Sequence, residues 1–108
     1  MKSTKQVLTE AAALGRKVGV AKGEFKAKGT DKMCINGLIG AVIKGAPLAN
    51  YREYDEMVVS DEFTAAVKIV APIIGAMEHW GALANWNNDP TTTEEQVLSV
   101  LEKAAASL

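Results

Sequence analysis

Apolar residues recur every three or four positions over most of the chain, a spacing that places them on one side of a helix. The spacing predicts helices over residues 4–15 (extending at most to 18), 32–44, 48–58, from 61 onward, and 94–106. Ser60 precedes the fourth of these and is suited to cap it. Pro72 lies inside the same helix and removes a backbone hydrogen bond, so we expect a kink or break near residues 69–71.

The first and last helices carry a capping box, in which two side chains satisfy each other's free backbone amides. Ser3 and Gln6 have this spacing at the N-terminal end, and Thr93 and Gln96 have it before the last helix. The last helix, over residues 94–106, is the element that the sequence predicts most firmly.

The segment 32–44 is apolar nearly all round, which is typical of a helix in the middle of a core. Thr30 or Asp31 is suited to cap it, and Gly45 is suited to end it. A buried strand is the alternative, because β-branched residues are frequent here. The length of the segment favours a helix, as does a stripe of small residues formed by Cys34, Gly37 and Ala41.

Two segments lack a helical pattern. Residues 19–30 contain three glycines and alternating lysines, with Phe25 and Ala27 at alternate positions. They form either a short edge strand in an irregular β-hairpin or an extended loop. Residues 83–90 resemble a turn-rich connector. We therefore expect an all-α protein, a compact bundle of four or five helices with helix 32–44 at its centre.

The 108 residues are enough for one domain, spanning residues 1–108, with no room for a second core. Apolar residues make up 48% of the chain and charged residues 23%, an ordinary globular balance. The longest apolar run, residues 37–43, is far too short for a membrane span, and the N-terminus lacks a secretory core. With a single cysteine, these features predict a cytoplasmic protein without a membrane partner.

Charge is divided unevenly along the chain. Residues 1–44 hold nine basic and three acidic residues, a net charge of +6, and residues 45–108 hold three and ten, a net charge of −7. Such asymmetry indicates either a basic face that binds a partner or two halves that pack together and neutralise each other. We favour the second interpretation.

The candidates for catalysis are few. His79 is the only histidine and Cys34 the only cysteine, and neither stands in a recognisable triad or zinc pattern. No glycine-rich phosphate loop occurs, and the acidic residues lack the spacing of a calcium loop. We therefore expect no enzyme activity, no cofactor and no metal.

Two groups of residues are candidate contact sites. Lys22, Lys26 and Lys28 lie near Phe25 in the basic segment and are candidate phosphate contacts. Tyr51, Arg52 and Tyr54 form a candidate contact patch for a protein partner, because tyrosine and arginine are frequent at interfaces. The alternative for the two tyrosines is that they simply cover the core.

The stretch Trp86-Asn87-Asn88-Asp89-Pro90 and the Thr93-capped helix after it resemble a small uncharacterised domain family of actinobacteria and their phages. That family has a Trp-Asn-Asp turn there and usually a Trp-Cys-x-x-Gly-Ala start to a buried helix, where this chain has Met33-Cys34-Ile35-Asn36-Gly37-Leu38. Asn88 and Met33 depart from the pattern. The resemblance implies a phage or mobile-element origin and no particular reaction. For the motif itself we expect a structural role, in which Trp86 packs on the core and Asn87 or Asn88 bonds backbone groups before the last helix.

Together these patterns favour a non-catalytic protein-interaction module. We expect a phage or bacterial accessory protein that binds a host protein or a second copy of itself. The alternative is a small nucleic-acid-binding protein that uses the basic segment 16–32. An enzyme that uses Cys34 or His79 ranks third.

Overall fold

Six helices follow one another along residues 2–108, the part of the chain that the computed structural model describes. They are α1 (Thr4–Val18), α2 (Ile35–Lys44), α3 (Tyr51–Val58), α4 (Asp61–Ile73), α5 (Trp80–Asn88) and α6 (Glu94–Ala106). The predicted all-α class is confirmed, and the helices are more numerous than the four or five expected. None of the six combines the length and the apolar composition that crossing a membrane requires.

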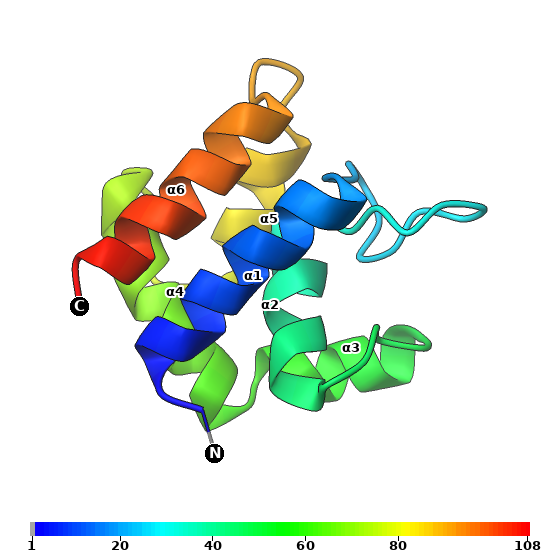
Figure 1. Cartoon of the computed structure of the whole chain (residues 1–108), viewed down its shortest axis with the longest axis horizontal. Coiled ribbons are helices and arrows are strands. Elements are labelled where there is room, and N and C mark those ends of the chain that lie inside the picture. Colours follow the sequence, from blue (N-terminus) through cyan, green and yellow to red (C-terminus); the bar gives the residue numbers. More distant parts are fainter. Residues whose placement is uncertain (1) are drawn as a thin grey trace.

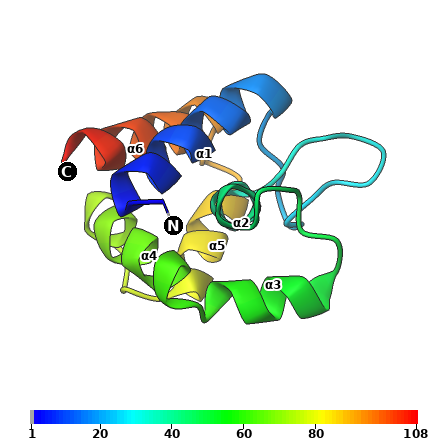
Figure 2. The same ribbon diagram turned by 60° about the horizontal axis from the view of Figure 1, so that its bottom comes forward.

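Helix α2 lies in the interior, as its apolar pattern predicts. Figure 1 shows α1 and α6 side by side and antiparallel. In Figure 2, α2 is seen end-on between α1 on one side and α3 on the other. It packs against α1, α3, α4 and α5, and every residue from Ile35 to Val42 is buried. The alternative of a buried strand is therefore wrong.

Helices α1 and α6 begin where their capping boxes predict, and α2 does not. Both capping boxes form, at Ser3–Gln6 and at Thr93–Gln96, and α6 spans the predicted residues. Helix α2 instead begins three residues later than predicted, with Cys34 as its N-cap in place of Thr30 or Asp31. The helix starts later because the backbone of Met33 is held by hydrogen bonds to Gly19 and Ala21 and so is not free to join it.

Two further boundaries differ from the prediction. Helix α3 begins at Tyr51 rather than at residue 48, because the side chain of Asn50 accepts a hydrogen bond from the Glu53 N–H and caps it there. Helix α4 continues through residues 69–71, so the predicted break is wrong. Pro72 lies in the last turn, with only Ile73 after it. It cannot donate a hydrogen bond to the carbonyl of Lys68, four residues back, but little helix follows for this loss to disrupt.

Helix α5 replaces the turn-rich connector expected over residues 83–90. His79 caps its start, and its Nδ1 accepts a hydrogen bond from the Gly81 N–H at 2.9 Å. Leu83 and Asn87, four positions apart, are both fully buried. Asparagine and glycine lower helix propensity, and tertiary packing overrides that preference here.

Residues 19–34 form a loop, which confirms the loop alternative and not the edge strand or β-hairpin. One isolated bridge joins Val20 to Met33, and no strand occurs in residues 2–108. The Ala21 N–H donates to the Met33 carbonyl at 2.9 Å, which closes the base of the loop. The loop projects beyond the bundle in Figure 1.

Ion pairs join the basic and acidic halves, as we expected from the charge pattern. Arg16 on α1 contacts both Glu95 (3.0 Å) and Glu102 (2.7 Å) on α6. Lys32 pairs with Glu94 across 3.8 Å. Part of the charge asymmetry is therefore neutralised by pairs within the molecule.

Candidate functional site

Four aromatic side chains from three segments meet at one side of the molecule. The ring of Phe25, in the loop, stacks on Tyr54 at 5.3 Å and meets the edge of Tyr51 at 5.0 Å. Tyr54 in turn meets Trp80 at 6.0 Å in a perpendicular contact. Each such pair contributes about 0.5–1.5 kcal/mol beyond the area that it buries. We call Phe25, Tyr51, Tyr54 and Trp80 the aromatic row.

The two tyrosines of the predicted contact patch have different roles in this row. Tyr54 packs against the core, and burial raises the pKa of its hydroxyl. Tyr51 remains 65% exposed, which is unusual for a large ring. Arg52 is exposed and pairs with Glu56 at 3.3 Å, one turn further along α3. Tyr51 is therefore the member of the patch most available to a partner.

The loop is seated on α2 by a close backbone contact. The carbonyl oxygen of Phe25 lies so near Gly37 that a β-carbon at that position would stand 2.0 Å from it. Only glycine permits this approach, since that distance is well inside van der Waals contact. The loop therefore holds Phe25 in place through the backbone as well as through ring stacking.

A groove of about 330 Å³ lies between the loop and the start of α3. Residues 24–29 form one wall and residues 48–51 form the other, and we call it the loop–α3 groove. Its apolar lining includes Phe25, Leu48 and Tyr51. Lys26 and Lys28 also line it, so one of the predicted phosphate contacts lies on each side of the loop residue Ala27.

The second wall of the groove is fixed by Glu53. Its carboxylate pairs with Lys44 and accepts a hydrogen bond from the Ala49 N–H at 2.9 Å. These two contacts, with Lys44 the larger cause, lower the pKa of Glu53. The segment between α2 and α3 is thereby tied at both of its ends.

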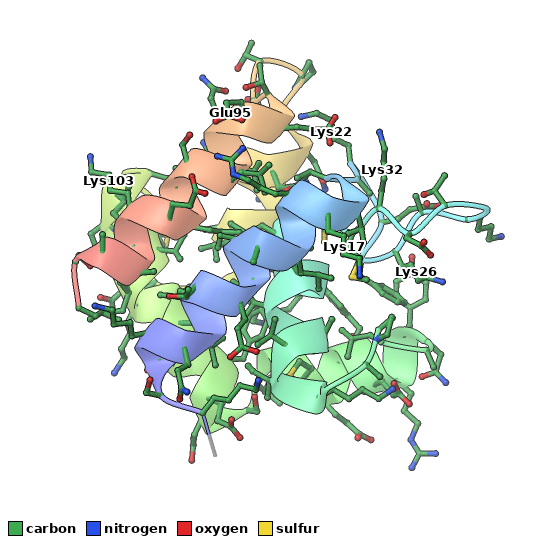
Figure 3. The ribbon with its side chains drawn as sticks, in the orientation of Figure 1. Lys17, Lys22, Lys26, Lys32, Glu95 and Lys103 are labelled. Carbon is green, nitrogen blue, oxygen red and sulfur yellow. The ribbon has the colours of Figure 1, made fainter. Side chains whose placement is uncertain are left out.

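The lysines predicted as phosphate contacts divide into two kinds. Lys26 and Lys28 are exposed and have no carboxylate within ion-pair distance among the residues described. The ammonium of Lys22 instead donates to three carbonyl oxygens, those of Asn87 (2.9 Å), Asp89 (2.7 Å) and Thr92 (2.6 Å). Figure 3 shows Lys22 beside the α5–α6 connection. The structure gives Lys22 a different role from the predicted one, because a cation there satisfies the carbonyls at the end of α5.

Cys34 and His79, the candidates for catalysis, each cap a helix. The Cys34 sulfur accepts from the Gly37 N–H at 3.4 Å at the start of α2, and burial raises the pKa of the thiol. His79 caps α5 and lies against Trp80, with ring centroids 5.1 Å apart. No three potential metal ligands gather anywhere in residues 2–108.

Two buried asparagines position the site, and sequence reasoning missed one of them. The Asn36 amide donates to the Tyr54 hydroxyl (3.1 Å) and to the Trp80 carbonyl (3.0 Å) and so ties α2 to the aromatic row. Its Oδ1 has no hydrogen-bond partner. The signal in the sequence is a lone asparagine inside an otherwise apolar segment, since a buried amide requires partners.

Asn87, from the motif that carries the resemblance, joins three segments. Its Oδ1 accepts from the Ile35 N–H at 2.9 Å, and its Nδ2 donates to the Ala21 carbonyl at 2.9 Å. Asn88 accepts from the Gly23 N–H at 2.7 Å. Trp86 packs against the core as expected. The asparagines thus bond backbone groups of the loop and of α2, and not groups next to the last helix.

Comparison with known proteins adds one relationship. No curated protein and no solved structure is significantly similar to this chain. A family of unknown function, DUF6197, matches residues 1–107, which is nearly the full length. The chain therefore belongs to the DUF6197 family.

Proposed function

We propose that the protein is a non-catalytic interaction module that binds another protein at the loop–α3 groove. The observation that carries the proposal is the convergence of an exposed ring, Tyr51, with two unpaired lysines on one preformed groove. Exposed tyrosines beside a concave surface are frequent centres of protein interfaces. The groove brings together residues that the sequence placed in two separate candidate patches.

The surroundings of the groove favour binding over catalysis. Cys34 is buried and His79 serves as a cap, so neither presents a reactive group at the groove. The walls are tied by Gly37 and Glu53, so a partner would meet an ordered surface and lose little entropy in ordering it. Binding would act by covering this face or by bridging two partners.

The finer biological setting is also part of the proposal. The resemblance to proteins of actinobacteria and their phages favours an accessory protein of a phage or of its bacterial host. A single free cysteine suits the reducing cytoplasm. The partner is either a host protein or a second copy of the chain, and light scattering at several concentrations separates these two.

A second candidate, binding of single-stranded nucleic acid, is favoured by one observation. Lys26 and Lys28 lie beside aromatic rings, which is the combination that holds a phosphate backbone and stacked bases. Two features weaken it. One face of Phe25 is already covered by Tyr54, and Lys22 is occupied by carbonyl groups.

Selection from a library of short random peptides tests the principal proposal. We expect selected peptides to shift the amide resonances of residues 24–29 and 48–51 in the intact protein. Tyr51→Ala should abolish their binding. Val59→Ala is the matched control, because it removes another exposed apolar side chain, at the far end of α3 and outside the groove. Peptides that bind both variants equally, or that shift other residues, would contradict the proposal.

A further inference from the structure

We infer that the occupant of the loop–α3 groove is an extended acidic peptide segment with one large apolar side chain. The inference rests on the function proposed above and specifies the chemistry of the partner. Three independent features of the groove support it: its charge, its size and the free backbone of its loop wall.

The lining of the groove has a net positive charge, because its two lysines outnumber its one acid. Its charged lining residues are Lys26, Lys28 and Glu24. Glu53, the nearest acid of the other wall, is neutralised by Lys44. The acid Glu56 on α3 is paired with Arg52 and lies outside the groove lining. A partner with carboxylates would therefore meet two free ammonium groups, and complementary charge of this kind steers and selects partners.

The size of the groove suits one anchoring side chain. Its volume of about 330 Å³ lies at the lower end of the range for small-molecule sites. Phe25, Leu48 and Tyr51 provide apolar surface within it. A single large apolar side chain, such as leucine, phenylalanine or tryptophan, fits within such a space.

The loop wall has free backbone groups that an extended chain could bond. Both backbone groups of Ala27 are bonded inside the loop. Its N–H donates to the Lys32 carbonyl, and its carbonyl accepts from the Thr30 N–H. The backbone groups of Lys26 and Lys28 have no hydrogen-bond partner within residues 2–108. Unpaired backbone groups of this kind can form hydrogen bonds with an extended peptide segment. The ammonium groups of the same two lysines favour an acidic segment over a neutral one.

The test is a titration of the intact protein with three blocked peptides that share a central phenylalanine. The flanking residues are glutamate in one peptide, serine in the second and lysine in the third. At low ionic strength we expect the glutamate peptide to bind about tenfold more tightly than the serine peptide, since two exposed ion pairs contribute modestly. Added salt should reduce this difference.

A charge reversal makes the test specific. Lys26→Glu with Lys28→Glu should transfer the preference to the lysine peptide without changing Tm, because both side chains are exposed. Lys68→Glu with Lys103→Glu is the matched control, with the same change in net charge. Figure 3 shows Lys103 on the opposite side of the molecule from Lys26. The control should keep the wild-type preference.

The possible failures are distinguishable. If library peptides bind the groove without enrichment in acidic residues, or if the serine peptide binds as tightly as the glutamate peptide, the acidic partner is refuted and the proposed function stands. If oligothymidylate displaces every peptide and shifts the same residues more strongly, nucleic acid is the partner and both proposals are overturned. If no peptide perturbs residues 24–29 and 48–51, both proposals also fail.

Discussion

The carbonyl oxygen of Phe25 and the α-carbon of Gly37 are in direct contact, with no room for a side chain between them. This contact joins the loop to the interior helix and sets the position of one wall of the groove. Its importance can be tested by adding a single methyl group.

We expect Gly37→Ala to displace the loop. Alanine favours a helix by up to about 1 kcal/mol, and forcing a backbone carbonyl aside costs about 1–3 kcal/mol. Gly40→Ala on the same helix is the control, because its methyl group meets the flexible side chains of Leu48 and Met57. Urea denaturation should show a lower free energy of unfolding for Gly37→Ala than for Gly40→Ala. Equal stabilities, with unchanged amide shifts at Phe25, would refute the contact.

Lys22→Met should destabilise the protein by about 1–2 kcal/mol, because three carbonyl oxygens lose a charged donor. Methionine keeps the apolar length of the side chain, so the change isolates the ammonium group. Lys28→Met is the control and should change stability by less than about 0.5 kcal/mol. Chemical denaturation measures both. A loss in Lys28→Met as large as that in Lys22→Met would argue against the cap.

Asn87→Ala should cost about 2–3 kcal/mol, because the buried Ile35 N–H and Ala21 carbonyl both lose their partner. Asn88→Ala removes a more exposed bond to the Gly23 N–H and should cost about 0.5–1 kcal/mol. Thermal and urea unfolding of the two variants give the comparison. The reverse order would show that Asn88 is the more important residue of the motif.

Acid should destabilise the contact between α1 and α6. The pKa values of Glu95 and Glu102 are lowered, chiefly by hydrogen bonds from Arg16. A lowered folded-state pKa contributes stability above the ordinary glutamate value of about 4.3, and the contribution is lost as pH falls through the folded pKa. Arg16→Gln should therefore flatten the fall of Tm in that acidic range. Parallel Tm profiles for wild type and variant would exclude this linkage.

The Cys34 thiol should react slowly with a disulfide reagent at neutral pH. It is only 5% exposed, and burial raises its pKa, so little thiolate is present. We expect a rate at least about tenfold below that of the unfolded chain in urea. Cys34→Ser supplies the blank, since it removes the only thiol. Equal rates in the folded and unfolded states would show that the thiol is accessible.

The sequence predicts best the elements whose signals are local. The capping boxes at Ser3 and Thr93 lie next to the helices that they start, and the sequence predicts both. The sequence does not predict helix α5, because residues far away along the chain support it. Lys22, for example, donates to the Asn87 carbonyl at the end of this helix. The late start of α2 has a similar cause, since the loop binds Met33.

The candidate site was predicted in parts and not as a whole. The sequence indicates Tyr51, Lys26 and Lys28 one by one as candidate contacts, but nothing in their spacing indicates that the loop folds back against the start of α3. That arrangement depends on Gly37, whose lack of a side chain admits the Phe25 carbonyl, and on Asn36, whose amide bonds the Tyr54 hydroxyl. Both are tertiary contacts, which spacing along the chain does not indicate. Periodicity identifies which residues are apolar and cannot identify which of them meet.

The bond between Asn87 and Ile35 has a consequence for the order in which the chain is made. The N–H of Ile35, the first residue of the interior helix, donates to a side chain 52 residues downstream. A ribosome therefore synthesises the whole of α2 before it reaches Asn87, and until then the buried Ile35 N–H lacks its partner. We expect fragments that stop before α5 to remain unfolded and to aggregate, so that this domain folds only after α5 has been made.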